Sequence, residues 1–347
     1  MNYLRALLVF FTLISSSCFP EFVPYTSGEE IAPAPLSEFD VGRGYFLAPN
    51  ERRPQEAADI LAGADPGMFI SVGTERGFVE ASIGKDVSHL LLVDNNRDVV
   101  LFNRLNAALI GVAKDLDDYI HLRFASSATE WVARSRGRGK ALYKDLLRHP
   151  HAWDWWKAMV RENKHLSEFH GTRNQYENGW FEGVSYLREQ DRFKKLKKLA
   201  SSGKIQAEFV ELASEPDVSK LAEGIRKCGL PVGAVDISNA WANGVPHHRV
   251  PRLLRQLGAV VHDNALLVIT GFRWSDIRES THPQEDWFYS GYRFAGFQRE
   301  PDSAKWKFGQ LLFSGKWPPR ELWGTIDHEP VSCSASVSNL AARSRKK

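Results

Sequence analysis

A glycine turn and an acidic residue about 20 positions later are the residues whose types and spacing best suit ligand binding. The stretch MFISVGTERGFVEAS places Gly73 at the end of an apolar run and Gly77 at the start of an amphipathic segment. Asp94 ends the next apolar run, HLLLVDN. In a βαβ unit such glycines let the backbone approach a ligand, and the acidic residue meets ribose hydroxyls. The order predicts a site for a nucleoside-type molecule. A tight strand-to-helix connection that binds nothing is the alternative.

A parallel sheet is needed to position these residues, and the chain's pattern predicts one. Short apolar runs alternate with helical segments, which is typical of a parallel sheet covered by helices. The expected strands are residues 68–73, 89–95, 205–211, 231–237 and 264–271, and the expected helices are 76–84, 97–113, about 215–228 and 247–258. Aromatic-rich runs at 286–298 and 305–315 suit an antiparallel hairpin at one edge. The predicted fold class is therefore α/β, with a doubly wound, mostly parallel sheet and an antiparallel C-terminal edge hairpin.

One long segment, residues 115–204, interrupts the alternation. Apolar residues at three- and four-residue spacing predict helices there. We expect this insertion to cap the carboxyl ends of the strands, where ligands bind in open α/β folds. Most of its tryptophans should be core residues. Its basic run RFKKLKKL predicts a solvated helix face, with contact to an anionic membrane as the alternative.

The glycine turn, Asp94 and the strand order resemble the class I S-adenosylmethionine-dependent methyltransferase superfamily, over residues 68–112 and, more loosely, 205–313. The resemblance implies S-adenosylmethionine as the cofactor. It implies that the residues binding this cofactor are Gly73, Glu75, Gly77, Asp94 and Asn95. The segment VDISNAW matches the superfamily's fourth-strand motif. This match implies that Asp236 and Asn239 are catalytic, lying with Ser238 beside the transferred methyl group.

Two positions of the turn depart from the superfamily's pattern. Glu75 stands where a middle glycine is usual, and Ser71 stands where an acidic residue is usual. A carboxylate at position 75 would repel the cofactor's own carboxylate unless Arg76 or another cation intervened. A different ligand, cationic or rich in hydroxyls, is the alternative.

The N-terminus has the pattern of an export signal. Arg5 precedes an apolar run, residues 6–14, that is too short to span a bilayer, and small residues follow. Cys18 resembles the lipid-modified cysteine of bacterial lipoproteins, although Ser15 replaces the usual Leu. The predicted location is therefore exported and membrane-anchored, with the cytoplasm as the alternative. The expected organisation is a signal peptide at 1–18, a Pro-rich tether at 19–54, the α/β domain at 55–330 and a flexible basic tail at 331–347.

The composition excludes little. Lys and Arg number 45 against 42 Asp and Glu, so a net charge of +3 gives no reason to expect a nucleic-acid partner. No metal is expected: the adjacent His247 and His248 point in different directions, and the carboxylates of residues 276–286 fit a polar loop. The predicted function is that of a methyltransferase-like protein with an unknown acceptor. Because S-adenosylmethionine is cytoplasmic, an exported, non-catalytic lipoprotein that keeps the fold for ligand binding or scaffolding is the alternative.

Overall fold

The computed structural model describes residues 54–135, 151–161, 184–238, 256–261, 264–272 and 287–293, with single residues 240 and 253. The expected signal peptide, Cys18, the tether and the C-terminal tail lie outside these residues. Asn239, the two adjacent histidines, the polar loop at 276–286 and the second aromatic run also lie outside them.

The described strands form one six-stranded sheet in the order β3-β2-β1-β4-β5-β6. The strands are β1 (Gly67–Val72), β2 (Val87–Asp94), β3 (Ile205–Phe209), β4 (Val232–Ser238), β5 (Leu266–Phe272) and β6 (Trp287–Arg293). The first five are parallel, and β6 runs antiparallel to β5. The chain order reverses between β1 and β4, which is the topological switch point of a doubly wound sheet. The predicted α/β class, with its doubly wound, mostly parallel and Rossmann-like sheet, is confirmed. Of the predicted edge hairpin, β6 is present and antiparallel, and the second run lies outside the described residues.

The helices begin and end at residues that the sequence marks. They are α2 (Pro54–Ala62), α3 (Glu75–Ile83), α4 (Arg97–Val112), α5 (Leu116–Phe124), α6 (Ala128–Ser135), α8 (Ala152–Trp156), the π-helix η3 (Lys157–Arg161), α10 (Gln190–Ser201) and α11 (Glu215–Cys228). The Asn96 and Ser214 side chains cap the starts of α4 and α11. Gly229 ends α11 in the left-handed conformation, with φ of 63°.

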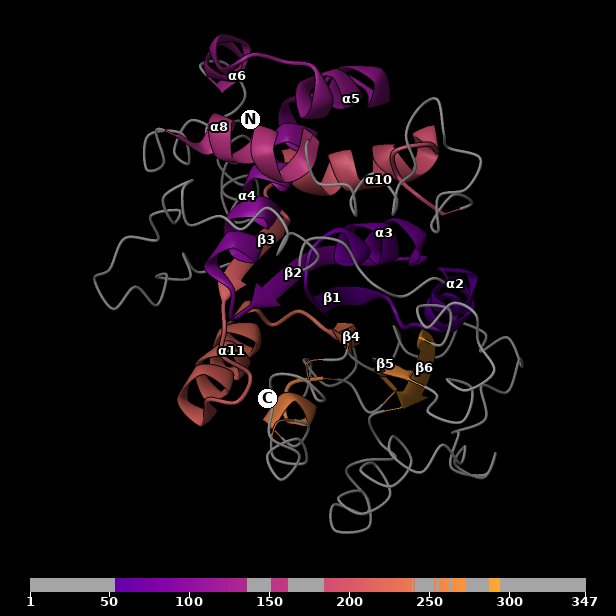
Figure 1. The fold of residues 1–347 in the computed structure, drawn as a ribbon. Coiled ribbons are helices and arrows are strands. Elements are labelled where there is room, and N and C mark those ends of the chain that lie inside the picture. The colour runs from indigo at the N-terminus through magenta and orange to yellow at the C-terminus, as the bar shows by residue number, and fades with distance from the viewer. Residues whose placement is uncertain are drawn as a thin grey trace, which may run out of the picture.

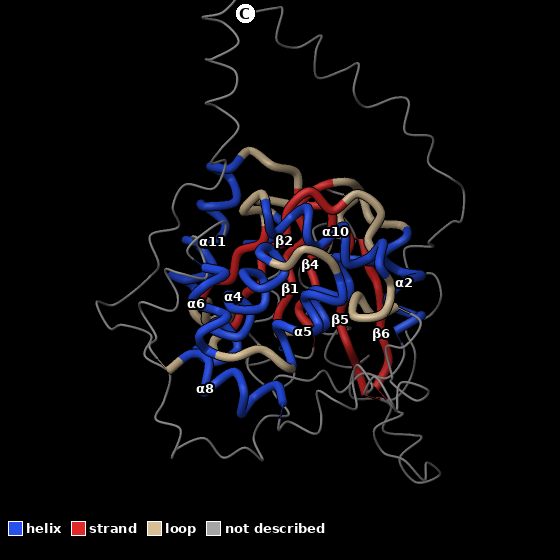
Figure 2. Tube along the Cα trace, turned by 90° about the horizontal axis from the view of Figure 1, so that it is seen from above, coloured by secondary structure: helices blue, strands red, loops and turns tan. Residues whose placement is uncertain are grey.

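The helices cover both faces of the sheet (Figure 1). On one face, α3 and α4 pack on β1, β2 and β3 through a core that includes Phe78, Phe102 and Leu92. On the other face, α11 supplies Leu221 and Ile225 to a second core. Seen from above, β1, β2 and β4 lie at the centre of the molecule, and β5 and β6 lie toward the side of α2 (Figure 2). The carboxyl ends of β1, β2 and β4 therefore come together at one edge of the sheet.

The insertion is helical as predicted in its described part, whereas much of the segment expected to cap the carboxyl edge, residues 136–150 and 162–183, lies outside the described residues. Helix α10 packs on α3 and α4, and α5 packs on α4, so they form a second helical layer outside the first (Figure 1). The reason is apolar burial: the Trp156 ring stacks on Phe102 of α4, with centroids 5.1 Å apart. Trp131 and Trp155 are also buried. This agrees with the prediction that most tryptophans of the insertion are core residues.

The basic helix α10 uses its apolar side within the protein. Phe193 and Leu196 are fully buried against the first helical layer. Two of its lysines, Lys195 and Lys197, donate to backbone carbonyls at the carboxyl ends of α3 and α4. Only a polar face remains outward, so this helix has no apolar face with which to enter a membrane.

Helix α2 was not predicted, and the structure places it over α3 and β6. A Cβ on Gly291 of β6 would lie 2.5 Å from the Ile60 side chain, which shows how closely the two elements approach. The α/β domain thus includes the helix that begins at Pro54.

Candidate functional site

The turn between β1 and α3 has the backbone of a ligand-binding turn. Gly73 has a φ of +93°, which favours glycine, and a Cβ there would approach only Arg76 Nη2, at 4.0 Å. The Gly73 carbonyl accepts a hydrogen bond of 2.8 Å from Asn103 Nδ2. Thr74 is the N-cap residue of α3 and is buried.

Gly77 has a packing role in the same turn. A Cβ on Gly77 would lie 2.5 Å from Leu92 Cδ2 and 2.9 Å from Ser71 Oγ. Glycine is thus required for α3 to approach β1 and β2. The tight-packing alternative therefore describes Gly77, whereas a Cβ on Gly73 would meet only Arg76 Nη2, at 4.0 Å, among the described residues.

Asp94 lies at the carboxyl end of β2, beside the glycine turn. Its Oδ1 accepts a 2.8 Å hydrogen bond from the Asn96 backbone N–H, and the backbone N–H of Gly73 also favours its charged form. Burial outweighs these contacts and raises the pKa of Asp94 to about 6. A carboxylate with a pKa shifted by burial in this position is a strong candidate to bind a ligand.

The neighbouring loop adds a residue that the sequence did not indicate. The Asn95 side chain, predicted as a cofactor contact, donates a 2.9 Å hydrogen bond to Glu211 Oε2 beyond the end of β3. Glu211 Oε1 accepts from the Ala213 N–H at 2.8 Å, so this loop is ordered by its own carboxylate. The only signal in the sequence was an acidic residue following a strand.

Arg76 ties the turn to the end of β4. Its Nε donates to Asp236 Oδ2 at 2.8 Å, its Nη1 to Ser238 Oγ at 2.6 Å and its Nη2 to the Val72 carbonyl at 3.0 Å. The Arg76 and Asp236 side chains are 5% and 0% exposed, so the pair is a buried salt bridge. It crosses the switch point of the sheet. Sequence reasoning considered Arg76 only as a counter-ion and missed this contact.

Asp236 lies beside Ser71, the position at which the resemblance led us to expect an acidic residue. Ser71 and Asp236 are paired residues of β1 and β4, and Ser71 Oγ lies 3.3 Å from Asp236 Oδ2. The carboxylate that the pattern expects on β1 is thus present on the adjacent strand. Asp236 is buried and paired with Arg76. Its catalytic role, to orient an acceptor or take its proton, stays a prediction.

The end of β4 is held in an uncommon conformation. Ser238 has a φ of 51°, in the left-handed region that favours glycine. Its backbone N–H donates to Asp236 Oδ1 at 2.7 Å, and its Oγ lies 3.4 Å from Thr270 Oγ1 of β5. Such strain persists only where neighbours enforce it, and it is typical of functional sites. The fixed residue directly precedes Asn239, which lies outside the described residues.

Glu75 points away from Arg76, although the two residues are adjacent. Its Oε1 pairs with Arg123 Nη2 of α5, and its Oε2 accepts a 2.7 Å bond from the Tyr186 hydroxyl. The Glu75 and Arg123 side chains are both 0% exposed. The carboxylate expected beside the cofactor is therefore bound by the insertion. The sequence analysis allowed for Arg76 or another cation to offset the Glu75 charge, and the cation that pairs with Glu75 is Arg123.

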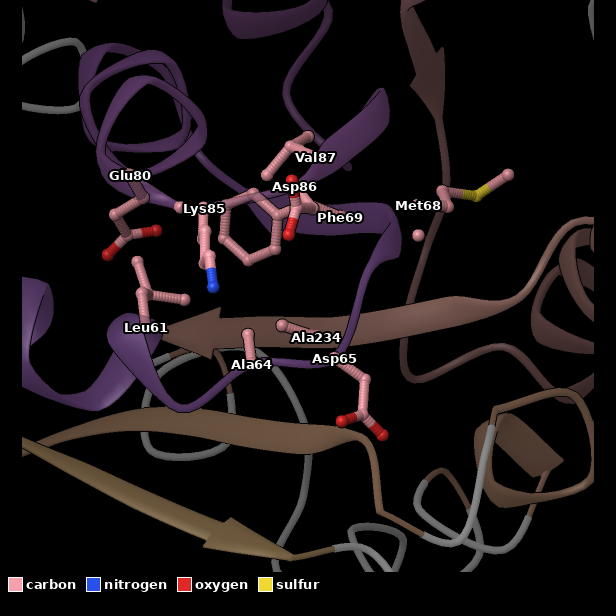
Figure 3. Close-up of a pocket in the computed structure, with 12 residues that line it drawn as sticks. Leu61, Ala64, Asp65, Met68, Phe69, Glu80, Lys85, Asp86, Val87 and Ala234 are labelled. Atoms are coloured by element: carbon pink, nitrogen blue, oxygen red, sulfur yellow. The ribbon is translucent and has the colours of Figure 1, made fainter. Parts of the chain in front are cut away.

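A small pocket lies at the opposite edge of the sheet. It is lined by the start of β1, the start of β2 and the end of α3, with Phe69, Glu80 and Lys85 among its residues. Figure 3 shows Phe69 and Lys85 in the middle of this lining and the Met68 side chain directed away. Ligands of doubly wound sheets bind at the carboxyl ends of the strands. This pocket is at the amino ends, so it is separate from the candidate site.

Neither a metal-binding cluster nor a membrane-spanning helix is present in the described residues. There, no three or more His, Cys, Asp or Glu side chains gather in a way that could hold a metal ion. In the same part of the chain, no helix combines the length and the apolar composition needed to cross a membrane.

A family comparison identifies relatives of this domain. Residues 46–307, most of the chain, match the family described as a domain of unknown function, DUF7790. The chain belongs to the DUF7790 family. No curated protein matches the sequence. The start of the DUF7790 match precedes α2, in agreement with a domain that includes this helix.

Solved structures with some similarity to this DUF7790 member include two of the rRNA methyltransferase aviRa from Streptomyces viridochromogenes, at 2.4 Å and 1.5 Å. Each is 14% identical and covers 73% of this chain and 84% of its own, with TM-scores of 0.29 and 0.30. These TM-scores are too low to carry an argument about this chain.

Proposed function

We propose that the domain binds S-adenosylmethionine, or a closely related nucleoside, across the carboxyl ends of β1, β2 and β4. The observation that carries the proposal is the juxtaposition of Gly73, in its positive-φ turn, with Asp94, whose pKa burial raises to about 6. A positive-φ turn after β1 beside a carboxylate at the end of β2 supports the proposal, because a carboxylate in this position can accept hydrogen bonds from ribose hydroxyls.

The proposed reaction is transfer of the cofactor's methyl group to an acceptor that the described residues do not identify. When bound, S-adenosylmethionine would supply a sulfonium methyl group to the acceptor's lone pair, the carbon–sulfur electrons would remain on the sulfur, and solvent would take any proton that the acceptor loses. This step needs orientation above all. Arg76 and Asp236 would supply that orientation by fixing the end of β4 relative to the glycine turn. Asn239, directly after this fixed end, is the residue we propose beside the acceptor.

The second candidate is an exported, non-catalytic lipoprotein that keeps the site for ligand binding or scaffolding. The observation in its favour is that two candidate acidic groups, Glu75 and Asp236, are each buried in an ion pair with an arginine. Neither is available to accept a proton from an acceptor while that pair persists. Ligand binding without methyl transfer would favour this candidate.

Calorimetric titration of S-adenosylmethionine and S-adenosylhomocysteine into the full chain tests the first proposal. We expect micromolar binding, about −8 kcal/mol, and its loss in Asp94→Ala. Asp86→Ala is the matched control, because Asp86 is an exposed aspartate at the opposite end of the same strand. Absence of binding by the unaltered chain, or equal affinity in Asp94→Ala, would remove the cofactor assignment.

A further inference from the structure

The residues around Glu75 form a buried polar network between the insertion and the glycine turn. Arg123 Nη1 donates to the Tyr119 hydroxyl at 2.9 Å and to Asn106 Oδ1 at 3.1 Å, while its Nη2 pairs with Glu75. Tyr186 donates to Glu75 and lies 3.4 Å from the Tyr119 hydroxyl. The network therefore joins α3, α4, α5 and the segment before α10.

Aromatic rings enclose the guanidinium of this network. Arg123 Cζ lies 5.7 Å from the ring centroids of Phe102 and Trp156 and 5.3 Å from that of Phe124. Interaction with Glu75 keeps the pKa of Arg123 well above its usual value, despite the opposing effect of burial. Glu75 is thus the carboxylate that compensates a charge buried in the insertion. Removing either partner would leave the other without its counter-charge.

Consecutive residues of α3 form ionic contacts in opposite directions. Glu75 is bound by the insertion through Arg123, and Arg76 is bound to β4 through Asp236. Both lie in the first turn of α3, which starts at Glu75, two residues after Gly73. The Glu75 and Arg76 side chains are therefore both held by partners outside α3. We expect a shift of α5 to displace the adjacent glycine turn as well.

We propose that Glu75 and Arg123 are positioning residues, through which the insertion sets the geometry of the glycine turn and is coupled to its occupancy. The ligand part of this inference rests on the proposed function, whereas the part that concerns the turn itself does not. Coupling free energies are reciprocal. A ligand on the turn should therefore stabilise the Arg123 region, just as an intact Arg123 should favour the ligand.

Hydrogen exchange of the full chain, with and without S-adenosylhomocysteine, provides the test. In Glu75→Gln without ligand, we expect faster exchange at residues 73–77 than in the unaltered chain, and S-adenosylhomocysteine binding weakened by about tenfold. In the unaltered chain, ligand should slow exchange at residues 119–123. In Glu75→Gln at saturating ligand, that slowing should be lost.

A matched control and a second variant keep the test decisive. Asp118→Asn breaks another Arg–carboxylate pair of the insertion, with Arg134, that is partly exposed and joins α5 to α6. It should leave exchange at residues 73–77 and ligand affinity unchanged. If Glu75→Gln fails to fold, the charge-balanced Glu75→Gln/Arg123→Met variant replaces it, because neither partner then leaves an uncompensated charge.

The outcomes separate the two proposals. Unchanged exchange at residues 73–77 in the folded variants would overturn the positioning role, whether or not ligand binds. Faster exchange there, with no binding by the unaltered chain, would support the positioning role while removing the cofactor assignment. Binding with no ligand-induced change at residues 119–123 would overturn the coupling.

Discussion

At the scale of single residues, the site consists of charged groups whose burial lowers the stability of the folded protein. Asp94 is the clearest case, because its folded-state pKa of about 6 lies above the ordinary 3.8 of an aspartate. The folded chain therefore holds this proton more tightly than the unfolded chain. The charged form of Asp94 therefore destabilises the folded state. A carboxylate that is present at a strand end despite this destabilisation is expected to bind a ligand.

Replacement of Asp94 by Asn should therefore stabilise the ligand-free protein at pH 7.5. Below the unfolded pKa of about 3.8, both states are protonated and Asp94 imposes no penalty. As pH rises through the window from 3.8 to about 6, the folded carboxyl ionises later than the unfolded one, and stability falls by up to about 3 kcal/mol. Urea denaturation of the unaltered chain and Asp94→Asn at pH 4 and pH 7.5 measures this difference.

Asp86→Asn controls for removal of an aspartate from the same strand's other end, and should show no such pH-dependent gain. A loss of stability in Asp94→Asn at pH 7.5 would mean that its backbone hydrogen bonds outweigh burial. The same variant should bind S-adenosylhomocysteine weakly, because an amide offers one acceptor oxygen where ribose hydroxyls need two. Greater stability with lost binding is the pattern expected of a functional carboxylate.

At the scale of the elements, α4 begins where the site ends. Asn96 caps this helix by accepting from the Asp98 N–H at 2.9 Å, and its own N–H donates to Asp94. We expect Asn96→Ala to lower the free energy of unfolding by about 1 kcal/mol, because one amide of the first turn loses its acceptor. Asn96→Asp keeps an acceptor and should restore most of that loss. Equal destabilisation in both variants would show that the cap is not the cause.

The elements were largely predictable from sequence, because each strand is a short apolar run bounded by turn residues and helical segments. Helix α11 was predicted at residues 215–228 and observed there, between the Ser214 cap and Gly229. Helix α2 was missed, since its residues fell at the boundary assigned to a Pro-rich tether. The insertion was predicted as helical, but its packing on α3 and α4 was not predicted, because helical periodicity states which side is apolar and not what covers it.

The site was predictable only where its residues are local. Gly73 and Asp94 follow strands and carry a short-range signal. The contact of Arg76 with Asp236 joins residues 160 positions apart, and that of Glu75 with Arg123 joins residues 48 apart. The hydrophobic periodicity of a sequence gives no information on ion pairs between residues so far apart. From the sequence, Glu75 was therefore expected to repel the carboxylate of a ligand unless Arg76 or another cation intervened. In the structure, Glu75 and Arg76 form separate ion pairs.

At the scale of the whole molecule, the proposed site and the pattern of the N-terminus predict different cellular locations. An S-adenosylmethionine site needs a cytoplasmic metabolite, and residues 1–18 have the pattern of an export signal. The apolar run at 6–14 is too short to hold the chain in a bilayer by itself. Stable anchoring would therefore depend on lipid attached to Cys18, because more than one acyl chain is needed for firm membrane association.

Fractionation of cells producing the full chain tests this dependence. The unaltered chain should sediment with membranes, and Cys18→Ala should move to the soluble fraction while still unfolding cooperatively. Cys228→Ala is the matched control, since Cys228 ends α11 within the folded domain and should leave the membrane association unchanged. Continued membrane retention of Cys18→Ala would argue against lipidation. Release of Cys18→Ala, combined with measurable S-adenosylhomocysteine affinity, would mean that a nucleoside site is carried outside the cytoplasm, and the search for its natural ligand would move to hydroxyl-rich molecules found there.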